Sequence, residues 1–393
     1  MICRILKNKC KVVLNLGKMP IANGFIKKKN LNKEYFFELK AAFNEKLGLF
    51  QLVNHPSPKK MFNKNYPFFT SSSAYMIKHF KIFASWIKKK YMFKNSLILE
   101  IGSNDGTFLK NFNKKNAFGY EPSRSVHLAA KYSGISSINR FFNLKNILIL
   151  KKYYKKFDVI VGSNVFCHIP NQINLIKSID KLLSKKGVLI FEEPYLGSMY
   201  EKVSYDQIYD EHIYMFSLTS VDRIYELFNF ELIDAYPQIT HGGSMRYIIK
   251  RKGTSKKSKR LLKLLKHEKS RNLDRISGCF KFRNDVKKSK IRLREKLEKI
   301  LKKNGKICGY GATSKSTTIL NYCNITNKMI DCIYDTTPEK IGKFSPGTHI
   351  PIIDYKYFKK SNYRNIFLFA WNHKKEIMKK EKRKNINWFN HIS

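Results

Sequence analysis

The stretch YDQIYDEHIYMFS, at residues 205–217, gathers a histidine, acids and tyrosines in a chain that is otherwise rich in lysine. Tyr209, Glu211 and His212 lie close together within it. Imidazole, carboxyl and phenol groups are the ones that enzymes use to move protons and to hydrogen-bond developing negative charge. The stretch is therefore a candidate site of acid–base chemistry. The alternative is a polar helix start with Asp210 as its cap.

A second constellation is EIGSNDGT, at residues 100–107, between an expected strand and an expected helix. Its glycines permit a tight turn and a close backbone approach to a ligand, and Glu121 after the next strand could bind both hydroxyls of a ribose. The run is not GxGxxG, and Glu100 would repel a pyrophosphate but suit the ammonium and sulfonium of S-adenosylmethionine. This cofactor is favoured over NAD, and the alternative is a turn without a ligand.

The candidate cofactor-binding residues are Glu100, Gly102, Asn104, Asp105, Gly106, Glu121 and Asn164. Strand and helix patterns alternate around them, which predicts a parallel sheet covered by helices on both faces. Strands are expected over 97–101, 117–121, 158–162 and 187–195. Helices are expected over 107–112 and 172–187. Residues 230–237 and 245–253 predict a hairpin that closes the sheet with an antiparallel edge.

Residues 254–303 are very basic with a helical pattern, which predicts packed helices with solvated lysines. Residues 305–323, GKICGYGATSKSTTILNYC, then repeat the order strand, glycine turn and helix. Further strands over 329–335, 349–354 and 365–371 complete a second, smaller α/β unit. Gly311 opens its turn and Lys315 lies one helical turn later, so this loop is either a second anion site or a fold element without a ligand.

The bulk composition sets broad limits. The chain has 393 residues, 43% of them hydrophobic, which suits two or three domains with packed cores. The net charge of +48 comes mostly from lysines spread along the whole chain, which favours compositional bias over a nucleic-acid partner. No apolar run is long enough for a membrane helix and no signal segment is visible, so a cytoplasmic protein with seven reduced cysteines is expected.

The chain resembles, from end to end, the S-adenosylmethionine-dependent sugar C-methyltransferases, which methylate a ring carbon of nucleotide-activated keto-deoxysugars. The matching stretches, in order, are LGKMPIANGF, EIGSNDGTFL, GYEPS, SNVFCHIP, EEPYLG, IYDEHIYMFSL, HGGSMR, GYGATSKSTTILNYC, IYDTTPEKIGKFSPGTHIPI and AWNHKKEI. The resemblance implies an α/β fold with a small N-terminal domain over 1–85. A central Rossmann-like class I methyltransferase sheet with an antiparallel edge hairpin would follow over 86–252, then a helical linker and a Rossmann-like domain over 253–393.

One departure from the family concerns its N-terminal domain, where members usually hold a structural zinc with two Cys-x2-Cys pairs. Cys3 remains, but Leu6, Asn44 and Leu47 stand at the other three ligand positions. Cys10 cannot complete a tetrahedral site with one partner. We therefore expect no metal, S-adenosylmethionine as the cofactor, and ordinary apolar packing in this domain.

The resemblance also assigns roles. Methylation beside a 4-keto group, at C3 of the sugar, needs a base and a stabilised enolate oxygen. It implies His212 as the base, Glu211 to orient it, and Tyr209 and His168 to hydrogen-bond the substrate or its enolate oxygen. Tyr66 would reach the site from the N-terminal domain. For His168, a purely structural role is the alternative.

The substrate itself would be a small nucleoside-diphosphate sugar. His241, in the predicted hairpin, would line its pocket or merely support the turn, and Gly311 and Lys315 would hold the diphosphate. The rival functions are an O- or N-methyltransferase of a related sugar nucleotide, a catalytically decayed protein that binds sugar nucleotide or S-adenosylmethionine, and a nucleic-acid binder driven by charge.

Overall fold

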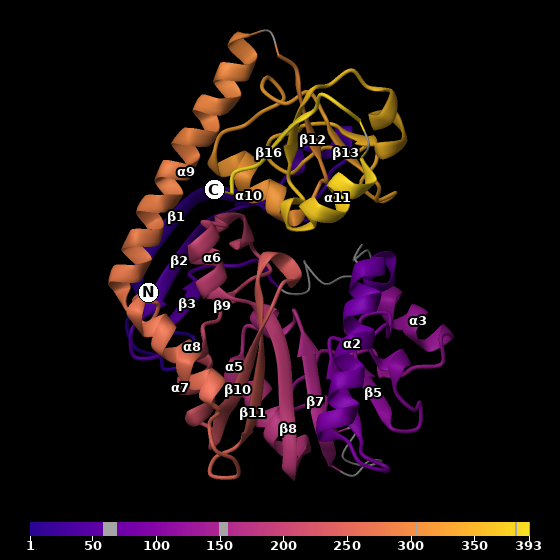
Figure 1. The fold of residues 1–393 in the computed structure, drawn as a ribbon, viewed down its shortest axis with the longest axis vertical. Helices are drawn as coiled ribbons and strands as arrows, with labels where there is room; N and C mark the ends of the chain where they lie inside the picture. The colour runs from indigo at the N-terminus through magenta and orange to yellow at the C-terminus, as the bar shows by residue number, and fades with distance from the viewer. Residues whose placement is uncertain (58–68, 149–155, 304, 382, 393) are drawn as a thin grey trace.

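The computed structural model describes residues 1–57, 69–148, 156–303, 305–381 and 383–392. These residues form sheets of four, seven and five strands. The seven-stranded sheet lies at the base of the view in Figure 1, the five-stranded sheet lies above it, and the four-stranded sheet lies along one side. The mixed α/β fold with a Rossmann-like central sheet, predicted from sequence, is confirmed.

The seven-stranded sheet has the strand order β10-β11-β8-β7-β4-β5-β6. Its five parallel strands are β4 (Ile98–Ile101), β5 (Ala117–Tyr120), β6 (Ser136–Ile138), β7 (Phe157–Ser163) and β8 (Leu183–Pro194). The hairpin of β10 (Phe230–Gln238) and β11 (Ser244–Arg251) closes the sheet, and β11 runs antiparallel to β8. Both the parallel sheet and its antiparallel edge were predicted.

Helices cover both faces of this sheet because each has an apolar stripe. On one face, α2 (Ala74–Tyr91) buries Phe80, Phe83 and Ile87 against strand residues such as Val159. On the other face lie α5 (Gln172–Leu182), α7 (Leu218–Glu226) and α8 (Lys259–Ser270). Two further helices, α3 (Arg124–Tyr132) and α6 (Leu196–Lys202), complete the unit. The predicted domain division after residue 85 falls within α2.

The helix expected over 107–112 is not formed. The glycine turn leads instead into further turns and a short 3-10 helix, η3 (Leu109–Asn111). Polar side chains compete here with helical hydrogen bonding: the Thr107 amide donates to the Asp105 carboxyl, and Asn111 Nδ2 donates to the main-chain carbonyls of Thr107 and Phe108. The helix N-terminus expected at the cofactor turn is therefore absent from this described segment.

The five-stranded sheet is parallel throughout, in the order β14-β13-β12-β15-β16. Its strands are β12 (Ile307–Tyr310), β13 (Ile333–Asp335), β14 (Ile352–Asp354), β15 (Asn365–Leu368) and β16 (Asn387–Phe389). The helix α10 (Ser314–Tyr322) follows β12, as predicted from the repeated glycine-turn pattern, and α11 (Lys374–Lys380) follows β15.

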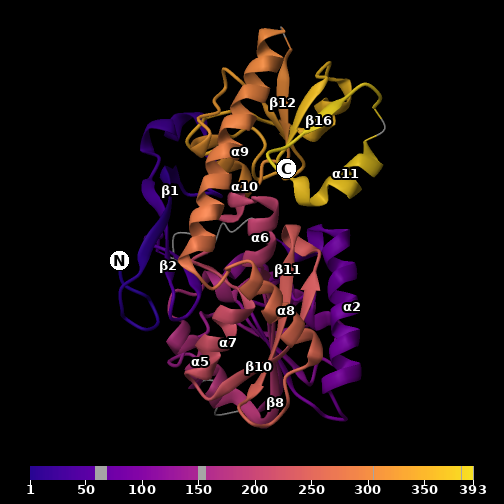
Figure 2. The same ribbon diagram turned by 60° about the vertical axis from the view of Figure 1, so that its left-hand side comes forward.

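The long helix α9 (Ile276–Lys302) connects the two larger sheets in sequence and runs beside the four-stranded sheet (Figures 1 and 2). Its buried stripe includes Phe282, Val286, Leu293 and Leu297, which pack into one core with residues of the four-stranded and five-stranded sheets. None of the helices in the described part of the chain combines the length and apolar character that crossing a bilayer requires.

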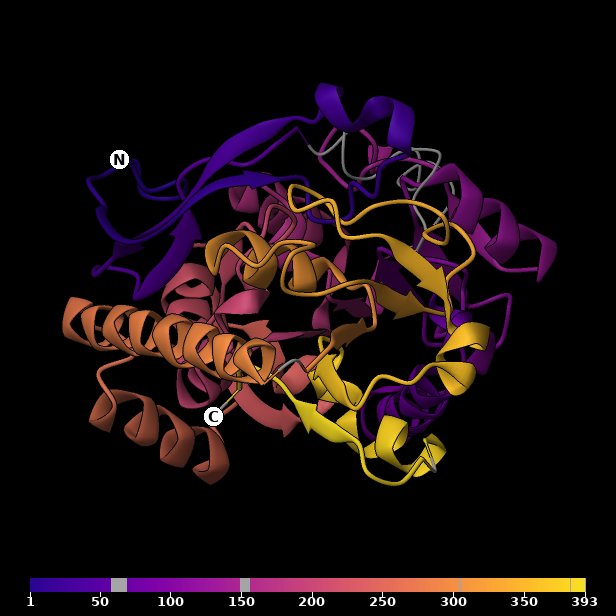
Figure 3. The same cartoon turned by 90° about the horizontal axis from the view of Figure 1, so that it is seen from above.

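The four-stranded sheet has the order β1-β2-β3-β9 and appears at the upper left of Figure 3. Three strands come from the N-terminal part: β1 (Lys11–Pro20), β2 (Phe36–Asn44) and β3 (Leu49–Leu52). The fourth, β9 (Tyr214–Met215), belongs to the YDQIYDEHIYMFS stretch and pairs antiparallel with β3. The candidate catalytic stretch is thus bound directly to the N-terminal sheet.

Two tight turns occupy the positions at which the family resemblance places zinc ligands. In the turn before β1, the Leu6 amide donates to Cys3 Sγ at 3.4 Å. In the turn between β2 and β3, the Leu47 amide donates to Asn44 Oδ1 at 3.0 Å. In each turn the next residue has a positive φ, of 59° and 62° respectively. The two turns therefore share one construction, in which a side-chain acceptor captures the amide three residues later.

Amide and thiol hydrogen bonds join these two turns. Asn44 Nδ2 donates to Asn8 Oδ1 at 2.7 Å and approaches Cys10 Sγ at 3.6 Å, and Cys10 lowers the pKa of the Cys3 thiol. The leucines of both turns pack into the adjoining core. Zinc needs four thiolate, imidazole or carboxylate ligands, and leucine and amide side chains do not supply them. The residues present do not fit a zinc ion.

We therefore expect the N-terminal unit to fold without metal. Purified protein should carry no stoichiometric zinc by elemental analysis, and EDTA should leave the midpoint of thermal unfolding unchanged. Asn44→Ala should lower the free energy of unfolding by about 1–3 kcal/mol, because it leaves buried polar groups unpaired. The exposed Asn113→Ala is the matched control. A midpoint that falls on chelation would contradict the expectation.

Candidate active site

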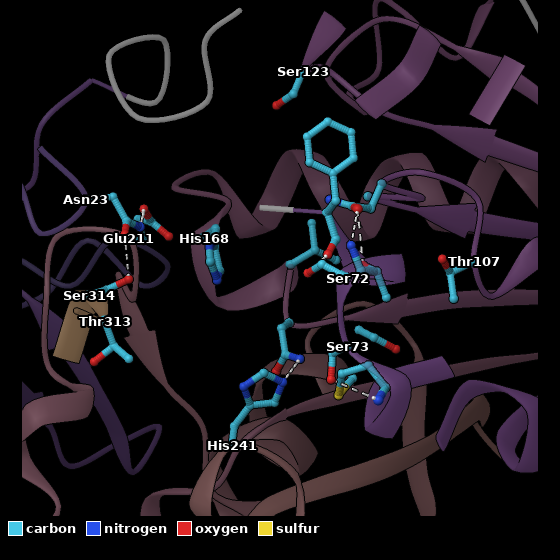
Figure 4. A pocket seen from close by; sticks show the side chains of 18 of the residues that line it. Asn23, Ser72, Ser73, Thr107, Ser123, His168, Glu211, His241, Thr313 and Ser314 are labelled. Carbon is cyan, nitrogen blue, oxygen red and sulfur yellow. Dashed lines mark hydrogen bonds between the residues drawn. The ribbon is translucent and has the colours of Figure 1, made fainter. Parts of the chain in front are cut away.

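A cavity of about 1610 Å³ lies between the carboxyl ends of strands in the seven-stranded and five-stranded sheets. Open α/β sheets place their ligands at this edge. A pocket for one small ligand usually measures about 300–1000 Å³, so the cavity has room for two. Figure 4 shows Glu211 and His168 on one side of it and Thr107 on the other.

The first half of the cavity surrounds the end of β4, where Glu100 is almost fully buried. Burial raises its pKa well above the usual range, and the charges of Asp105 and Glu121 raise it further. Its Oε2 has no hydrogen-bond partner among the described residues. A buried, unpaired carboxyl oxygen fits a cationic ligand group, as the ammonium and sulfonium of S-adenosylmethionine would provide.

Gly102 and Glu121 shape the same half. Gly102 has φ +71°, and a Cβ there would stand 2.7 Å from a methyl group of Val165, so only glycine fits this turn. Glu121 accepts hydrogen bonds from the Asn104 amide at 3.0 Å and the Ser123 amide at 2.7 Å. Each of its oxygens keeps a second lone pair for a ribose hydroxyl.

Two of the predicted cofactor residues do not line the cavity. Asp105 instead accepts hydrogen bonds from the Ser71 amide at 2.8 Å and from Thr107 Oγ1 at 2.6 Å. Gly106 has φ +77° and packs against Ile135. Both residues support the turn from behind rather than contact a ligand, which corrects their expected role.

The candidate catalytic stretch forms a hydrogen-bonded chain around His212. Its Nδ1 lies 2.7 Å from the main-chain carbonyl of Gln207, so Nδ1 must carry the proton. Its Nε2 is therefore the acceptor for the Tyr209 hydroxyl at 2.8 Å. Burial lowers the pKa of His212 well below the ordinary range, and the nearby His168 lowers it further. The ring is a neutral acceptor at neutral pH.

Glu211 does not orient His212, contrary to expectation. Its Oε1 accepts a hydrogen bond from Asn23 Nδ2 at 2.7 Å, and Asn23 Oδ1 in turn accepts one from Ser314 Oγ at 2.9 Å (Figure 4). In this non-helical turn, neighbouring side chains point in different directions. Burial raises the pKa of Glu211, and the charge of Asp210 raises it further.

His168 lies beside His212, with ring centroids 5.2 Å apart in an edge-to-face arrangement. It belongs to the short helix η4 (Phe166–His168) after β7, and burial lowers its pKa to about 4. Glu193 holds this loop by accepting hydrogen bonds from the Val165 and Phe166 amides at 2.9 and 2.7 Å. Glu193 was not among the predicted site residues.

The predicted substrate residues meet at the second half of the cavity. Lys315 Nζ donates to the main-chain carbonyl of His241 at 3.3 Å and lies 5.0 Å from the centre of the Trp371 ring. Burial lowers the pKa of Lys315. Its Nζ also lies 3.5 Å from Asn372 Oδ1, and the charge of Asp206 acts against the lowering of its pKa by burial. Gly311, with φ +84°, lines the same side.

Asn164 connects the two halves, because its Nδ2 donates to His241 Nε2 at 2.7 Å. Burial lowers the pKa of His241 to about 3, so its ring is a neutral acceptor. Both residues have positive φ, 52° in each case, and line the cavity. Tyr66, the remaining predicted catalytic residue, lies outside the described residues.

Asp206 was missed although it lies in the first stretch considered. It is fully buried, and its Oδ2 accepts a hydrogen bond from Trp371 Nε1 at 2.6 Å. Its Oδ1 faces His391 Nε2 at 3.3 Å. Burial alone would raise the pKa of Asp206, but His391 and the other partners outweigh burial and lower it. This carboxylate joins the segments that follow β15 and β16 of the five-stranded sheet to the candidate catalytic stretch.

Asp335 was also missed, and a sequence signal for it existed. It ends β13, the strand after the second glycine turn, as Glu121 follows β5 after the first. Its carboxyl accepts hydrogen bonds from the Ala312 amide at 2.6 Å and the Thr337 amide at 2.7 Å. An acid at this place is typical of ribose-binding sheets, so each sheet brings one such acid to the cavity.

Gly102→Ala should lower both stability and cofactor affinity. A Cβ at this positive φ is strained by about 1–3 kcal/mol and must also displace Val165. Thermal unfolding and calorimetric titration with S-adenosylmethionine would measure the two effects. Gly342→Ala is the control, because it has a similar φ of +76° with no atom within 4 Å of the added Cβ. Equal affinities of the two variants would contradict a ligand-shaping role for Gly102.

Comparisons with known proteins match the chain in three successive parts. Residues 3–62 match the family described as "Putative zinc binding domain", 77–235 match "Methyltransferase domain" and 239–389 match "C-methyltransferase C-terminal domain". Over 375 residues the chain is 24% identical to the C-methyltransferase NovU of Streptomyces niveus. That alignment covers 94% of this chain and 89% of NovU.

Other similarities are partial. A tRNA U34 carboxymethyltransferase of Campylobacter lari is 27% identical over 118 residues, which cover 28% of this chain and 40% of that protein. The solved structure of the plantazolicin methyltransferase BpumL with SAH is 18% identical, covers 44% of this chain and 82% of its own, and has a TM-score of 0.35. From the three ordered matches and the full-length similarity to NovU, the chain belongs to the S-adenosylmethionine-dependent C-methyltransferases.

Proposed function

We propose that the enzyme methylates a ring carbon of a nucleoside-diphosphate keto-deoxysugar, at C3 beside a 4-keto group. The observation that carries the proposal is the buried pair of Tyr209 and His212 on the wall of a cavity with room for a second ligand. S-adenosylmethionine supplies the methyl group. A carbon can receive that group only after a base has removed its proton.

The Tyr209–His212 pair is suited to that removal. The Tyr209 hydroxyl donates to His212 Nε2, so the phenol oxygen can take the proton from carbon while its own proton passes to the imidazole. The C–H electron pair then moves into an enolate, whose oxygen needs hydrogen-bond donors. His168 lies beside this pair and lines the same cavity.

The second half of the cavity suits the nucleotide part of the substrate. Lys315 offers a buried ammonium, and the turn at Gly311 brings main-chain atoms to the cavity wall. Two negative phosphates would be the natural partners of this desolvated cation. Asp335 lies at the position where such sheets bind a ribose. These residues support a nucleoside-diphosphate sugar as the substrate class.

The direct experiment is incubation with methyl-labelled S-adenosylmethionine and a panel of 4-keto-6-deoxyhexoses linked to dTDP, UDP, GDP and CDP. We expect one labelled methyl on C3 of at least one panel member, located by mass spectrometry and NMR. Label on oxygen or nitrogen would identify a different methyltransferase. Absence of label together with absence of calorimetric S-adenosylmethionine binding would indicate a decayed protein.

His212→Ala should leave S-adenosylmethionine affinity unchanged and reduce turnover about 10²–10⁴-fold, because it removes the final proton acceptor. Calorimetry and initial rates on the accepted panel member would measure the two quantities. His267→Ala, in the exposed face of α8, is the matched control and should behave as wild type. Turnover retained by His212→Ala would remove this histidine from the reaction.

The pH profile tests the burial of the site. Burial lowers the pKa values of His212, of His168 to about 4 and of His241 to about 3. Each ring therefore remains neutral as the pH falls through the ordinary histidine range. We expect protonation of these three rings to cause no fall in kcat/KM between about pH 7 and about pH 5.5. A half-loss centred near pH 6.5 would instead indicate a base with an ordinary histidine pKa.

A further inference from the structure

A β-turn from the N-terminal part of the chain, residues 21–24, is inserted between the catalytic stretch and helix α10. The turn is closed by a hydrogen bond from the Gly24 amide to the Ile21 carbonyl at 2.9 Å. Ala22 at its centre is buried, and Asn23 lines the cavity. The sequence motif LGKMPIANGF contains this turn, but sequence alone gave it no role.

The turn makes four hydrogen bonds in a repeated pattern. The Ala22 amide donates to Asp210 Oδ1 at 3.0 Å, and the Ala22 carbonyl accepts from Thr317 Oγ1 at 2.8 Å. One residue later, Asn23 Nδ2 donates to Glu211 Oε1 at 2.7 Å, and Asn23 Oδ1 accepts from Ser314 Oγ at 2.9 Å. Each turn residue thus joins one acid of the candidate catalytic stretch to one hydroxyl of α10. Figure 4 shows the connection made by Asn23.

We propose that Glu211 acts as a neutral carboxylic acid and that Asn23 is the positioning residue that keeps it turned toward the cavity, where it hydrogen-bonds the keto oxygen of the substrate. This inference rests on the proposed function, since it needs a carbonyl substrate. The Ser314 hydroxyl fixes the Asn23 amide so that its nitrogen faces Glu211. With Oε1 occupied by Asn23, the other oxygen of Glu211 is the one left to carry a proton and donate it to a ligand.

The surroundings of Glu211 favour its neutral form. Burial raises its pKa, and the Asp210 carboxyl beside it raises it further, while the hydrogen bond from Asn23 acts in the lowering direction. Glu211 also acts on the Cys167 thiol, whose pKa is raised first by burial, then by Glu193 and then by the charge of Glu211. No described cation forms a salt bridge with Glu211. A neutral acid donates a strong hydrogen bond to an oxygen that becomes an enolate.

The first test separates a neutral acid from a carboxylate. Glu211→Gln keeps the shape and a donor, so it should retain turnover within about tenfold of wild type on the accepted panel member and lose the fall in rate at alkaline pH. Glu211→Ala removes the donor and should lose about 10²–10³-fold. A Gln variant as slow as the Ala variant would overturn the proposal. That result would mean that the reaction needs the negative charge of a carboxylate, which both variants lack, and not the hydrogen-bond donor that Gln retains.

The second test asks whether Asn23 acts through Glu211. Asn23→Ala should lower kcat about 10–100-fold, because a misplaced group costs rate, and should move the alkaline limb of the profile to higher pH. In the Glu211→Ala background the same change should have little further effect. Thr317→Val loosens the Ala22 side of the turn and should lower stability without moving the alkaline limb. Additive losses in the double variant would overturn the proposal.

A third measurement needs no substrate, so it distinguishes this inference from the proposed function. Carboxyl ¹³C signals of glutamate-labelled protein, with Glu211 assigned from the Glu211→Gln spectrum, give its titration directly. We expect a midpoint above the ordinary range in wild type and a higher one in Asn23→Ala. An equal Glu211 midpoint in wild type and in Asn23→Ala would overturn the inference, even if the substrate panel confirms carbon methylation. A shifted midpoint without panel turnover would count against the substrate class alone.

Discussion

The hydrogen bond from His212 Nδ1 to the main-chain carbonyl of Gln207 decides which ring nitrogen is basic. Because Nδ1 donates, Nε2 accepts from Tyr209, and the pair is oriented toward the cavity. Gln207 is fixed in turn by the short helix η5 (Tyr205–Gln207), whose Asp206 is held by Trp371 from the five-stranded sheet. The choice of the ring nitrogen that carries the proton in His212 therefore depends on how the two larger sheets are joined.

Burial controls most of the other ionisable groups around the cavity. It disfavours the charged forms of Glu100, Glu211 and Lys315. In the proposed complex, the ligands would supply the partners of these groups, a cation beside Glu100 and an anion beside Lys315. The large positive charge of the whole chain would attract an anionic ligand from solution. The position of the bound ligand would be set by the few buried groups in the cavity.

Much of the architecture follows from local sequence patterns. Apolar runs predicted the strands and the edge hairpin, and the repeated glycine turn predicted the second parallel sheet. The expected helix after Gly106 failed because Asp105 and Asn111 capture nearby backbone groups. The site was harder to predict. The residues of the stretch were found, but the pairing of Glu211 with Asn23 spans 188 positions and leaves no periodic signal.

The two-residue strand β9 has a consequence for how the enzyme folds. It pairs Met215 with Phe50, a contact of large sequence separation, whereas the cofactor half is built from strands β4 to β7 that follow one another closely. Long-range pairings form slowly because closing a long loop costs chain entropy. We therefore expect a folding chain to assemble the strands around β4 first and to bring Tyr209 and His212 into place last, so that methyltransferase activity appears later than the compact fold.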